Sequence, residues 1–196
     1  MPPESGGRDA ILDTSAKLFS QHGYKEVSIR DIAQACGMTN AALYYHFKNK
    51  EDLFLAMLQR DHDKAMVALH EAANSPGDLH EDLRQLVTLY AEIACTRRQS
   101  FQLLWRDMRQ MEDVRARKMF GEMQHDLLQP LVERLTTAQA AGEVRAGEVR
   151  VYTRLLYSMI MSLSHEGKLD KQHKLTAQEV ELVIGVFLNG VETPSR

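Results

Sequence analysis

Apolar residues recur at intervals of three and four along most of the chain, which is the pattern of an amphipathic α-helix. The spacing is clear in Ile11, Leu12, Ala16 and Phe19, and it returns in the segment 53–58. No comparable stretch alternates between apolar and polar residues with a period of two. The sequence therefore predicts an all-α fold.

Residues that break helices are few in the interior of the chain. Three of the five prolines lie in the tails, which leaves Pro76 and Pro130 as internal interruptions. We expect about nine helices in total, and the apolar spacing after Asp78 predicts five of them, at about 79–97, 99–110, 113–141, 148–166 and 176–191. Pro130 is expected to kink the helix in which it lies, because its ring removes one backbone hydrogen bond.

The composition fits a protein with a sizeable core. With 196 residues, 44% of them hydrophobic, the chain is long enough for one domain or for a small domain fused to a larger one. It has neither an apolar run of membrane-spanning length nor a secretory signal, so a cytoplasmic location is expected. Cys36 and Cys95 lack metal-binding spacing, which favours reduced thiols, with a redox-sensing pair as the alternative.

Two short predicted helices, about 29–36 and 39–47, are joined by a tight turn at Gly37 and Met38. Ser28 and Thr39 stand at their starts as N-cap residues. The small Ala33 lies where the two helices would cross. This is the spacing of a helix-turn-helix motif.

The second of these helices is predicted to have two different faces. At 100° per residue, Leu43 and Phe47 fall on the inner side. The outer side holds Ala41, Tyr44, Tyr45 and Lys48. Exposed tyrosine hydroxyls beside small alanines suit insertion into the major groove of DNA.

These residues predict a set of DNA contacts. Asn40 is the best candidate to read a base edge, since its amide both donates and accepts hydrogen bonds. Arg30 could reach the DNA backbone or a guanine edge. Phosphate contacts are predicted for Ser28, Tyr44, His46, Lys48 and Lys50. Thr39, Ala41 and Tyr45 complete the predicted DNA-binding set. Residues 1–60 contain seven basic and seven acidic side chains, so modest non-specific affinity is expected.

The segment Gly23 to Phe54, "GYKEVSIRDIAQACGMTNAALYYHFKNKEDLF", resembles the DNA-binding domain of the TetR family of transcriptional regulators. The matching features include Gly37, the run "LYYHF" and the run "KNKEDL". The resemblance implies a helix-turn-helix domain at 1–48, in which His46 would contact phosphate although the helical wheel places it nearer the inner side. It also implies a helical effector-binding and dimerisation domain at 49–196. Such a protein is a homodimer that usually represses transcription until a small molecule binds.

In the family, the last two helices of each subunit form a four-helix dimer bundle. The resemblance places these helices at Val149 to Glu166 and Thr176 to Val191, and Leu155 belongs to the apolar surface of the first. The expected dimer interface consists of Tyr152, Leu156, Met159, Ile160, Leu163, Val180, Val183, Ile184, Phe187 and Leu188. The alternative for these side chains is the core of a single chain.

Thioethers and aromatic rings suggest where an effector would bind. Flexible methionines and aromatic side chains suit an adaptable, mainly apolar pocket. The candidates are Tyr90, Trp105, Met108, Met111, Phe120, Met123 and Tyr157. Arg109, His125 or Arg154 could anchor a polar or anionic end of the ligand, and nothing in the sequence chooses among them. An ordinary core is the alternative.

Other functions are less well supported by the sequence. The chain has no GxSxG, GxxxxGK[ST] or GxGxxG motif, so we predict that it is not an enzyme and that it needs no cofactor. His62, Met66 and His70 share a helix face and could form a metal sensor, but a solvated helix side is favoured and no metal site is predicted. A helical interaction module without an effector would leave the exposed tyrosines unexplained.

Overall fold

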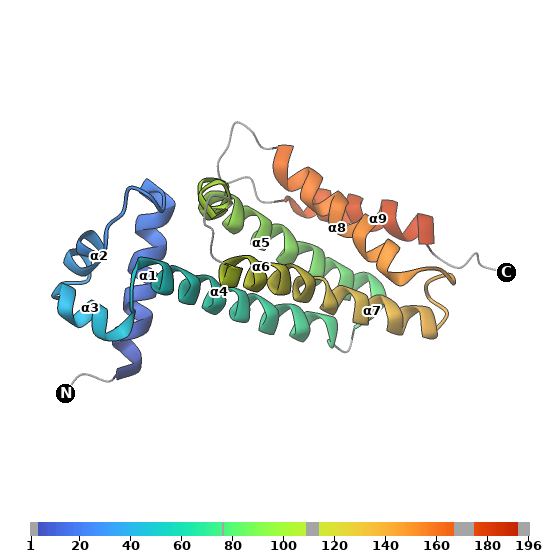
Figure 1. Ribbon diagram of the computed structural model, residues 1–196. Helices are drawn as coiled ribbons and strands as arrows, with labels where there is room; N and C mark the ends of the chain where they lie inside the picture. Colours follow the sequence, from blue (N-terminus) through green and yellow to red (C-terminus); the bar gives the residue numbers. More distant parts are fainter. Residues whose placement is uncertain (1–3, 76, 109–113, 167–174, 192–196) are drawn as a thin grey trace. The chain divides into compact units, whose positions relative to one another are not determined.

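A computed structural model describes residues 4–75, 77–108, 114–166 and 175–191. These residues form nine α-helices, which confirms the predicted all-α class (Figure 1). The chain divides into two compact units: residues 1–64 with 97–119, and residues 65–96 with 120–196. These units are defined by compactness, and the division after Lys64 lies within α4. The functional boundary expected near residues 48–50 is a different kind of division and stays a prediction.

The first unit contains α1 (Glu4–His22), α2 (Ile29–Ala35), α3 (Asn40–His46) and the start of α4 (Lys50–Ala73). Both α1 and α3 pack against α2 (Figure 1). Each of the four helices buries apolar side chains. Phe19 of α1 and Phe54 of α4 meet edge to face, with ring centroids 5.6 Å apart. This packing joins α1 to α4.

Polar contacts also join α1 to α4. Arg60 donates to a carboxylate oxygen of Asp13 at 2.8 Å and to the carbonyl oxygen of Asp9 at 3.2 Å. The guanidinium is mostly buried, with 15% of the side chain exposed. A largely desolvated arginine holds its partners more firmly than an exposed ion pair does.

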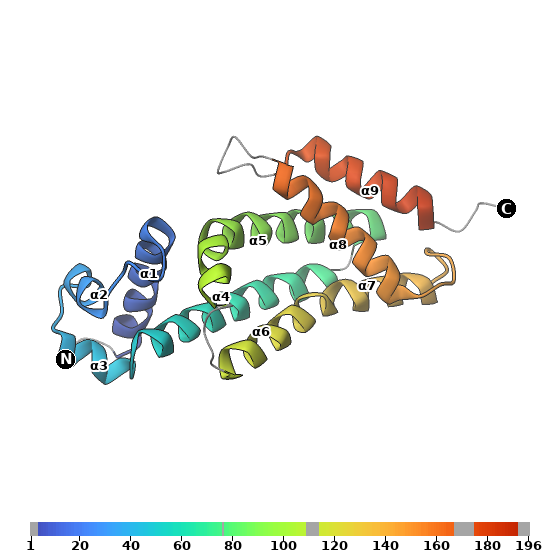
Figure 2. The ribbon, with the colours of Figure 1, turned by 45° about the horizontal axis from the view of Figure 1, so that its top comes forward.

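The second unit contains the end of α4, most of α5 (Leu79–Met108), the end of α6 (Val114–Leu127), α7 (Gln129–Ala140), α8 (Val149–Glu166) and α9 (Ala177–Val191). Its core gathers Leu83, Leu86 and Val87 of α5 with Leu131 and Leu135 of α7. The helices α8 and α9 lie side by side and run in opposite directions (Figure 2). Both contribute side chains to this core.

Two of the helix boundaries predicted after residue 78 are wrong. The helices expected at 79–97 and 99–110 are a single helix, α5. The segment between them, "TRRQ", contains neither glycine nor proline, so nothing stops the backbone hydrogen bonding.

The helix expected at 113–141 is instead interrupted at Leu128, just before Pro130. Close to this interruption, the buried hydroxyl of Tyr90 donates to the carbonyl oxygen of Leu127 at 2.6 Å. A backbone carbonyl at the interruption between α6 and α7 is thus hydrogen-bonded to a side chain of α5. Burial raises the pKa of Tyr90, so this hydroxyl stays protonated.

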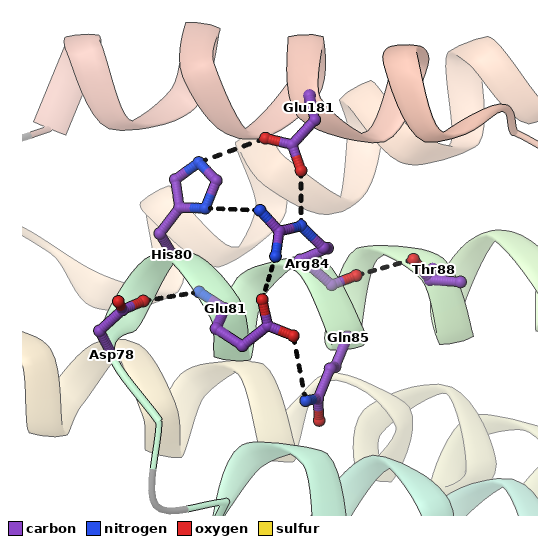
Figure 3. A network of polar contacts seen from close by, with 7 residues as sticks. All are labelled: Asp78, His80, Glu81, Arg84, Gln85, Thr88 and Glu181. Atoms are coloured by element: carbon purple, nitrogen blue, oxygen red, sulfur yellow. Dashed lines mark hydrogen bonds and ion pairs between the residues drawn. The ribbon is translucent and has the colours of Figure 1, made fainter.

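A polar network on the surface of the second unit connects α5 to α9 (Figure 3). Arg84 donates to Glu181 at 2.6 Å and also contacts Glu81. His80 lies 3.4 Å from the second carboxylate oxygen of Glu181. The hydrogen bond from Arg84 lowers the pKa of Glu181. This pairing contributes stability at neutral pH that is lost as the pH falls through the lowered pKa.

A buried ion pair connects α5 to α7. Arg134 donates to Asp82 at 2.6 Å, and only 9% and 1% of the two side chains are exposed. The second carboxylate oxygen of Asp82 has no hydrogen-bonding partner among the described residues. Arg134 also lies 3.8 Å from a carboxylate oxygen of the more exposed Glu143. The buried charge of Asp82 is therefore compensated by Arg134, whereas Arg134 has a second partner.

None of the helices, within the described residues, combines the length and the apolar character needed to cross a membrane.

Candidate DNA-binding site

The helix-turn-helix is built from α2, a four-residue connection and α3. Gly37 adopts φ 66°, a left-handed conformation that favours glycine. The amide of Met38 then donates back to the carbonyl of Ala33 at 2.9 Å, which closes the end of α2. Ala33 is itself almost fully buried. The turn therefore has the local chemistry that the sequence predicts.

Both helices begin at the predicted caps. The hydroxyl of Thr39 accepts a hydrogen bond from the amide of Ala42 at 3.1 Å. Ser28 and Asp31 form a reciprocal capping box at the start of α2. The hydrogen bonds from Ser28 lower the pKa of the exposed Asp31 carboxyl. Ser28 is exposed but already engaged, and its predicted phosphate contact stays a prediction.

The helix α3 has the two faces expected from its sequence. Leu43 and Phe47 are buried, with 0% and 1% of the residue exposed, whereas Tyr44 and Tyr45 are exposed by 52% and 84%. Ala41 also lies on the surface. Two aromatic side chains on the solvent side of a short helix bury little apolar area in this chain, so they are available to a partner.

Polar side chains surround the exposed tyrosines in the helix-turn-helix segment. Arg30 on α2, Asn40 on α3 and Lys48 just after α3 are all exposed. Their combination of guanidinium, amide and ammonium groups can donate to phosphate oxygens and to base edges. These DNA contacts remain predictions that fit the exposure of the residues.

His46 lies between the two faces of α3. It is partly buried, and its ring meets the rings of Tyr45 and Phe47 at centroid distances of 5.4 and 6.4 Å. This partial burial agrees with the helical wheel, which places His46 nearer the inner side. A phosphate contact from its outer edge stays a prediction.

Lys50 has a role that the sequence did not reveal. Its ammonium group donates to the carbonyl oxygens of Tyr24 and Val27 at 2.7 and 2.8 Å, and lies 4.2 Å from the centre of the Tyr24 ring. The start of α4 thus holds the connection between α1 and α2. Burial, with the nearby Glu51 carboxylate, raises the pKa of Tyr24 to about 12. A phosphate contact from Lys50 stays a prediction.

Lys48 and Lys50 form a matched pair for separating binding from stability. We expect Lys50→Met to lower the free energy of unfolding by about 1–3 kcal/mol, because partly buried carbonyls lose a charged donor. Lys48→Met should leave stability unchanged, since its side chain is exposed, and should weaken DNA binding. Urea denaturation followed by circular dichroism measures the first effect. Equal stability of the two variants would show that the Lys50 contacts contribute nothing.

The predicted effector residues are described only in part. Trp105, Met108 and Phe120 lie in α5 and α6, but the structure does not describe their side chains. Arg109 and Met111 lie outside the described residues. Tyr90 and Met123 are buried, and the rings of Tyr90 and Tyr157 meet edge to face at 5.8 Å. Tyr90 belongs to the core of the second unit, and Tyr157 packs against that core. Effector contacts from these three residues stay predictions.

His125 and Arg154, two of the three predicted anchors, line a common cavity. They come from α6 and α8 and are both exposed. Nothing in the sequence indicates that these two side chains meet.

The predicted dimer interface stays a prediction, and most of its side chains are buried within the single chain. Seven of its ten residues belong to the core of the second unit within one chain: Leu156, Ile160, Val180, Val183, Ile184, Phe187 and Leu188. Met159 and Leu163 pack against that core, and the hydroxyl of Tyr152 lies 3.4 Å from the carbonyl oxygen of Ala146. Their burial favours the alternative that the sequence left open, the core of a single chain.

The exposed apolar side chains of α8 and α9 are different ones. Val151 and Leu155 on α8 are exposed by 40% and 55%, and Leu182 and Val186 on α9 by 60% and 56%. We call these four residues the outer apolar face. Periodicity showed that both helices are rich in apolar residues, but not which of them turn outward.

The residues considered for metal or redox sensing are only partly described. His62 is buried, and Nδ1 of His70 lies 3.5 Å from Glu133. Among the described residues, no cluster of three or more metal-ligating side chains is present. Cys36 is a free, partly exposed thiol, and the side chain of Cys95 lies outside the described set.

Comparison with known proteins places this arrangement in a family. Residues 11–57 match the family "Bacterial regulatory proteins, tetR family", and residues 76–170 match "Tetracyclin repressor-like, C-terminal domain". The chain belongs to the TetR family of transcriptional regulators. The first match covers the helix-turn-helix and the start of α4, and the second covers much of the remaining helical part.

Individual relatives agree with the TetR family assignment. The chain is 47% identical over 70 residues to the transcriptional repressor ComR of Escherichia coli, a match covering 36% of this chain and 33% of ComR. It spans less than half the length of each of the first curated relatives it matches. The regulator UidR of Escherichia coli is 22% identical over 96% of this chain and 94% of its own.

A solved structure also shares the fold. The chain resembles a protein from Saccharomonospora viridis that was solved in complex with choline. The TM-score is 0.79 at 22% identity, and the match covers 97% of this chain and 100% of that one. At this identity the likeness shows the fold alone.

Proposed function

We propose that this TetR-family protein is a ligand-responsive transcriptional repressor that binds a pseudo-palindromic DNA operator as a homodimer. The observation that carries the proposal is the outward position of Tyr44 and Tyr45 on a capped helix-turn-helix. The relative ComR is itself named as a repressor. We call α1 to α3 the DNA-binding head.

The head would dock with α3 in the major groove. Asn40, at the first position of α3, reads a base edge, while Tyr44 and Lys48 contact phosphates on either side. Arg30 reaches the DNA from α2. A dimer presents two such helices about one DNA turn apart, or a multiple of it, which requires a two-fold related operator.

The outer apolar face of α8 and α9 is the surface that supports dimerisation. Its four side chains are exposed in the single chain, and the family pairs its last two helices between subunits. An apolar surface shared by two adjacent helices loses its contact with water when a second copy covers it.

A double substitution, Leu155→Glu with Leu182→Glu, is expected to convert the dimer to a monomer. Sedimentation velocity measures the oligomeric state directly, and operator affinity should fall with it. Val67→Glu is the matched control. Val67 is exposed to a similar degree, 59%, but it belongs to α4 and not to α8 or α9. A double variant that remains dimeric would exclude the outer apolar face as the interface.

The ligand response would pass through α4. This helix belongs in part to each compact unit, and Lys50 at its start is bonded to the connection between α1 and α2. A ligand that prefers one arrangement of α4 would change how the two heads are held. It lowers operator affinity only by as much as its affinities for the two arrangements differ.

Selection of binding sites from a library of random DNA duplexes tests the proposal. We expect the purified protein to enrich a pseudo-palindromic sequence. Fluorescence anisotropy should show that it binds this sequence at least about 1,000-fold more tightly than random DNA. Failure to enrich any sequence would overturn the proposal. An asymmetric enriched site would overturn the homodimer part alone.

A further inference from the structure

A cavity of about 350 Å³ opens on the second unit, between the α6–α7 junction and the start of α8. This volume lies at the small end of the range for pockets that hold organic ligands. Its lining combines basic, polar and apolar side chains: His125, Leu128, Gln129, Val132, Arg150, Thr153 and Arg154.

Thr153 supplies the clearest sign that the cavity binds something polar. Only 1% of this residue is exposed, and its hydroxyl has no hydrogen-bonding partner among the described residues. A buried hydroxyl without a partner costs free energy in the folded chain. A ligand oxygen seated in the cavity would accept a hydrogen bond from it.

Two arginines stand on either side of this hydroxyl in the sequence. Arg150 and Arg154 are four residues apart on α8, so they share one helix face. Within the described residues neither guanidinium has a hydrogen bond or an ion pair. By contrast, Arg60, Arg84 and Arg134 are all paired with carboxylates. Two uncompensated guanidinium groups beside one cavity attract an anion.

The opposite wall adds polar and apolar groups. The amide nitrogen of Gln129 lies 3.1 Å from Nε2 of His125, which links the two side chains across the break between α6 and α7. Leu128 and Val132 provide the apolar part of the lining. A ligand that matches this cavity therefore has an anionic head and a compact apolar body.

We infer that this cavity binds a small organic anion, with a carboxylate or phosphate head held by Arg150, Arg154 and the Thr153 hydroxyl. The apolar body of the ligand lies against Leu128 and Val132. Binding itself does not depend on DNA; only the consequence that the anion lowers operator affinity rests on the proposed function.

Isothermal titration calorimetry of the full chain without DNA tests the site. The probes are benzoate, its neutral isostere benzamide, phenyl phosphate and inorganic phosphate, all at up to millimolar concentration. Benzoate or phenyl phosphate should bind at least about tenfold more tightly than benzamide, since a charged hydrogen bond is worth at least that factor. The stronger of the two identifies the head group as carboxylate or phosphate.

Variants locate the binding in this cavity. Arg150→Ala with Arg154→Ala should weaken binding by roughly 100-fold, about tenfold for each charged contact. Thr153→Val keeps the side-chain shape and should weaken binding severalfold without loss of stability. The control Arg145→Ala, at an exposed arginine outside the cavity, should bind as the parent does.

Three results would overturn the inference: equal binding of benzamide and benzoate, unchanged affinity of the double variant when circular dichroism shows it folded, or no binding of any probe. Each is recorded without DNA, so it leaves the operator proposal standing. Conversely, a protein that binds benzoate but enriches no operator would retain this site and lose the proposed function.

Discussion

Replacing Tyr44 and Tyr45 together by alanine is expected to lower operator affinity on the order of 100-fold or more, because Tyr44 loses a hydrogen bond to a charged phosphate and Tyr45 loses its contact in the major groove. The unfolding free energy should barely change, since both side chains are largely exposed. Fluorescence anisotropy on a selected operator measures the affinity, and thermal unfolding provides the check on folding.

Tyr44→Phe with Tyr45→Phe is the matched variant for this experiment. It keeps the rings and removes only the hydroxyls, so a comparable loss of affinity assigns the contact to hydrogen bonding. Retained affinity would assign it to packing of the rings against the sugar-phosphate backbone. Full operator affinity in the alanine variant would contradict docking through this face of α3.

Replacing Arg134 by methionine is expected to destabilise the second unit by about 3–5 kcal/mol, because it leaves the Asp82 carboxylate buried without its counter-charge. For a chain of this size that corresponds to a drop of roughly 6–20 °C in melting temperature. Differential scanning calorimetry measures the change. The surface ion pairs of the chain should cost far less when broken.

The double variant Asp82→Leu with Arg134→Met separates the pair's net contribution from the penalty of breaking it. Because both charges are removed, most of the lost stability should return. A double variant as unstable as the single one would mean that the cost comes from packing rather than from an uncompensated charge. Operator binding by the folded fraction should be unaffected in either case.

Local chemistry made much of the head predictable from sequence. Gly37 ends α2, and the caps at Ser28 and Thr39 begin the two helices. Each of these signals acts within a few residues, so it can be read along the chain. The two faces of α3 followed in the same way, because Leu43 and Phe47 are one helical turn apart.

Contacts between distant segments were not predictable in this way. The ammonium of Lys50 reaches a carbonyl 26 residues earlier in the chain, and no periodicity records such a meeting. The same holds for His125 and Arg154, which line one cavity although 29 positions separate them. The sequence could name candidate anchors but could not bring them together.

The outer apolar face of α8 and α9 was not predictable for a related reason. Leu155 and Leu156 are neighbours in the sequence, yet one is 55% exposed and the other fully buried. A helix with apolar residues around much of its circumference does not reveal which stripe its own chain will cover. That choice depends on where α5 and α7 lie, which is a property of the fold as a whole.

Several cations of the first unit are occupied within the chain itself. Arg8 lies over the ring of Phe47, Lys50 is bonded to carbonyl oxygens, and Arg60 is paired with Asp13. Fewer free cations mean fewer phosphates neutralised on DNA of arbitrary sequence. On a chromosome, where competing sites number roughly 10⁶–10⁹, such a regulator is less readily sequestered away from its operator. If the proposed function holds, fewer molecules per cell would then be needed to keep that operator occupied.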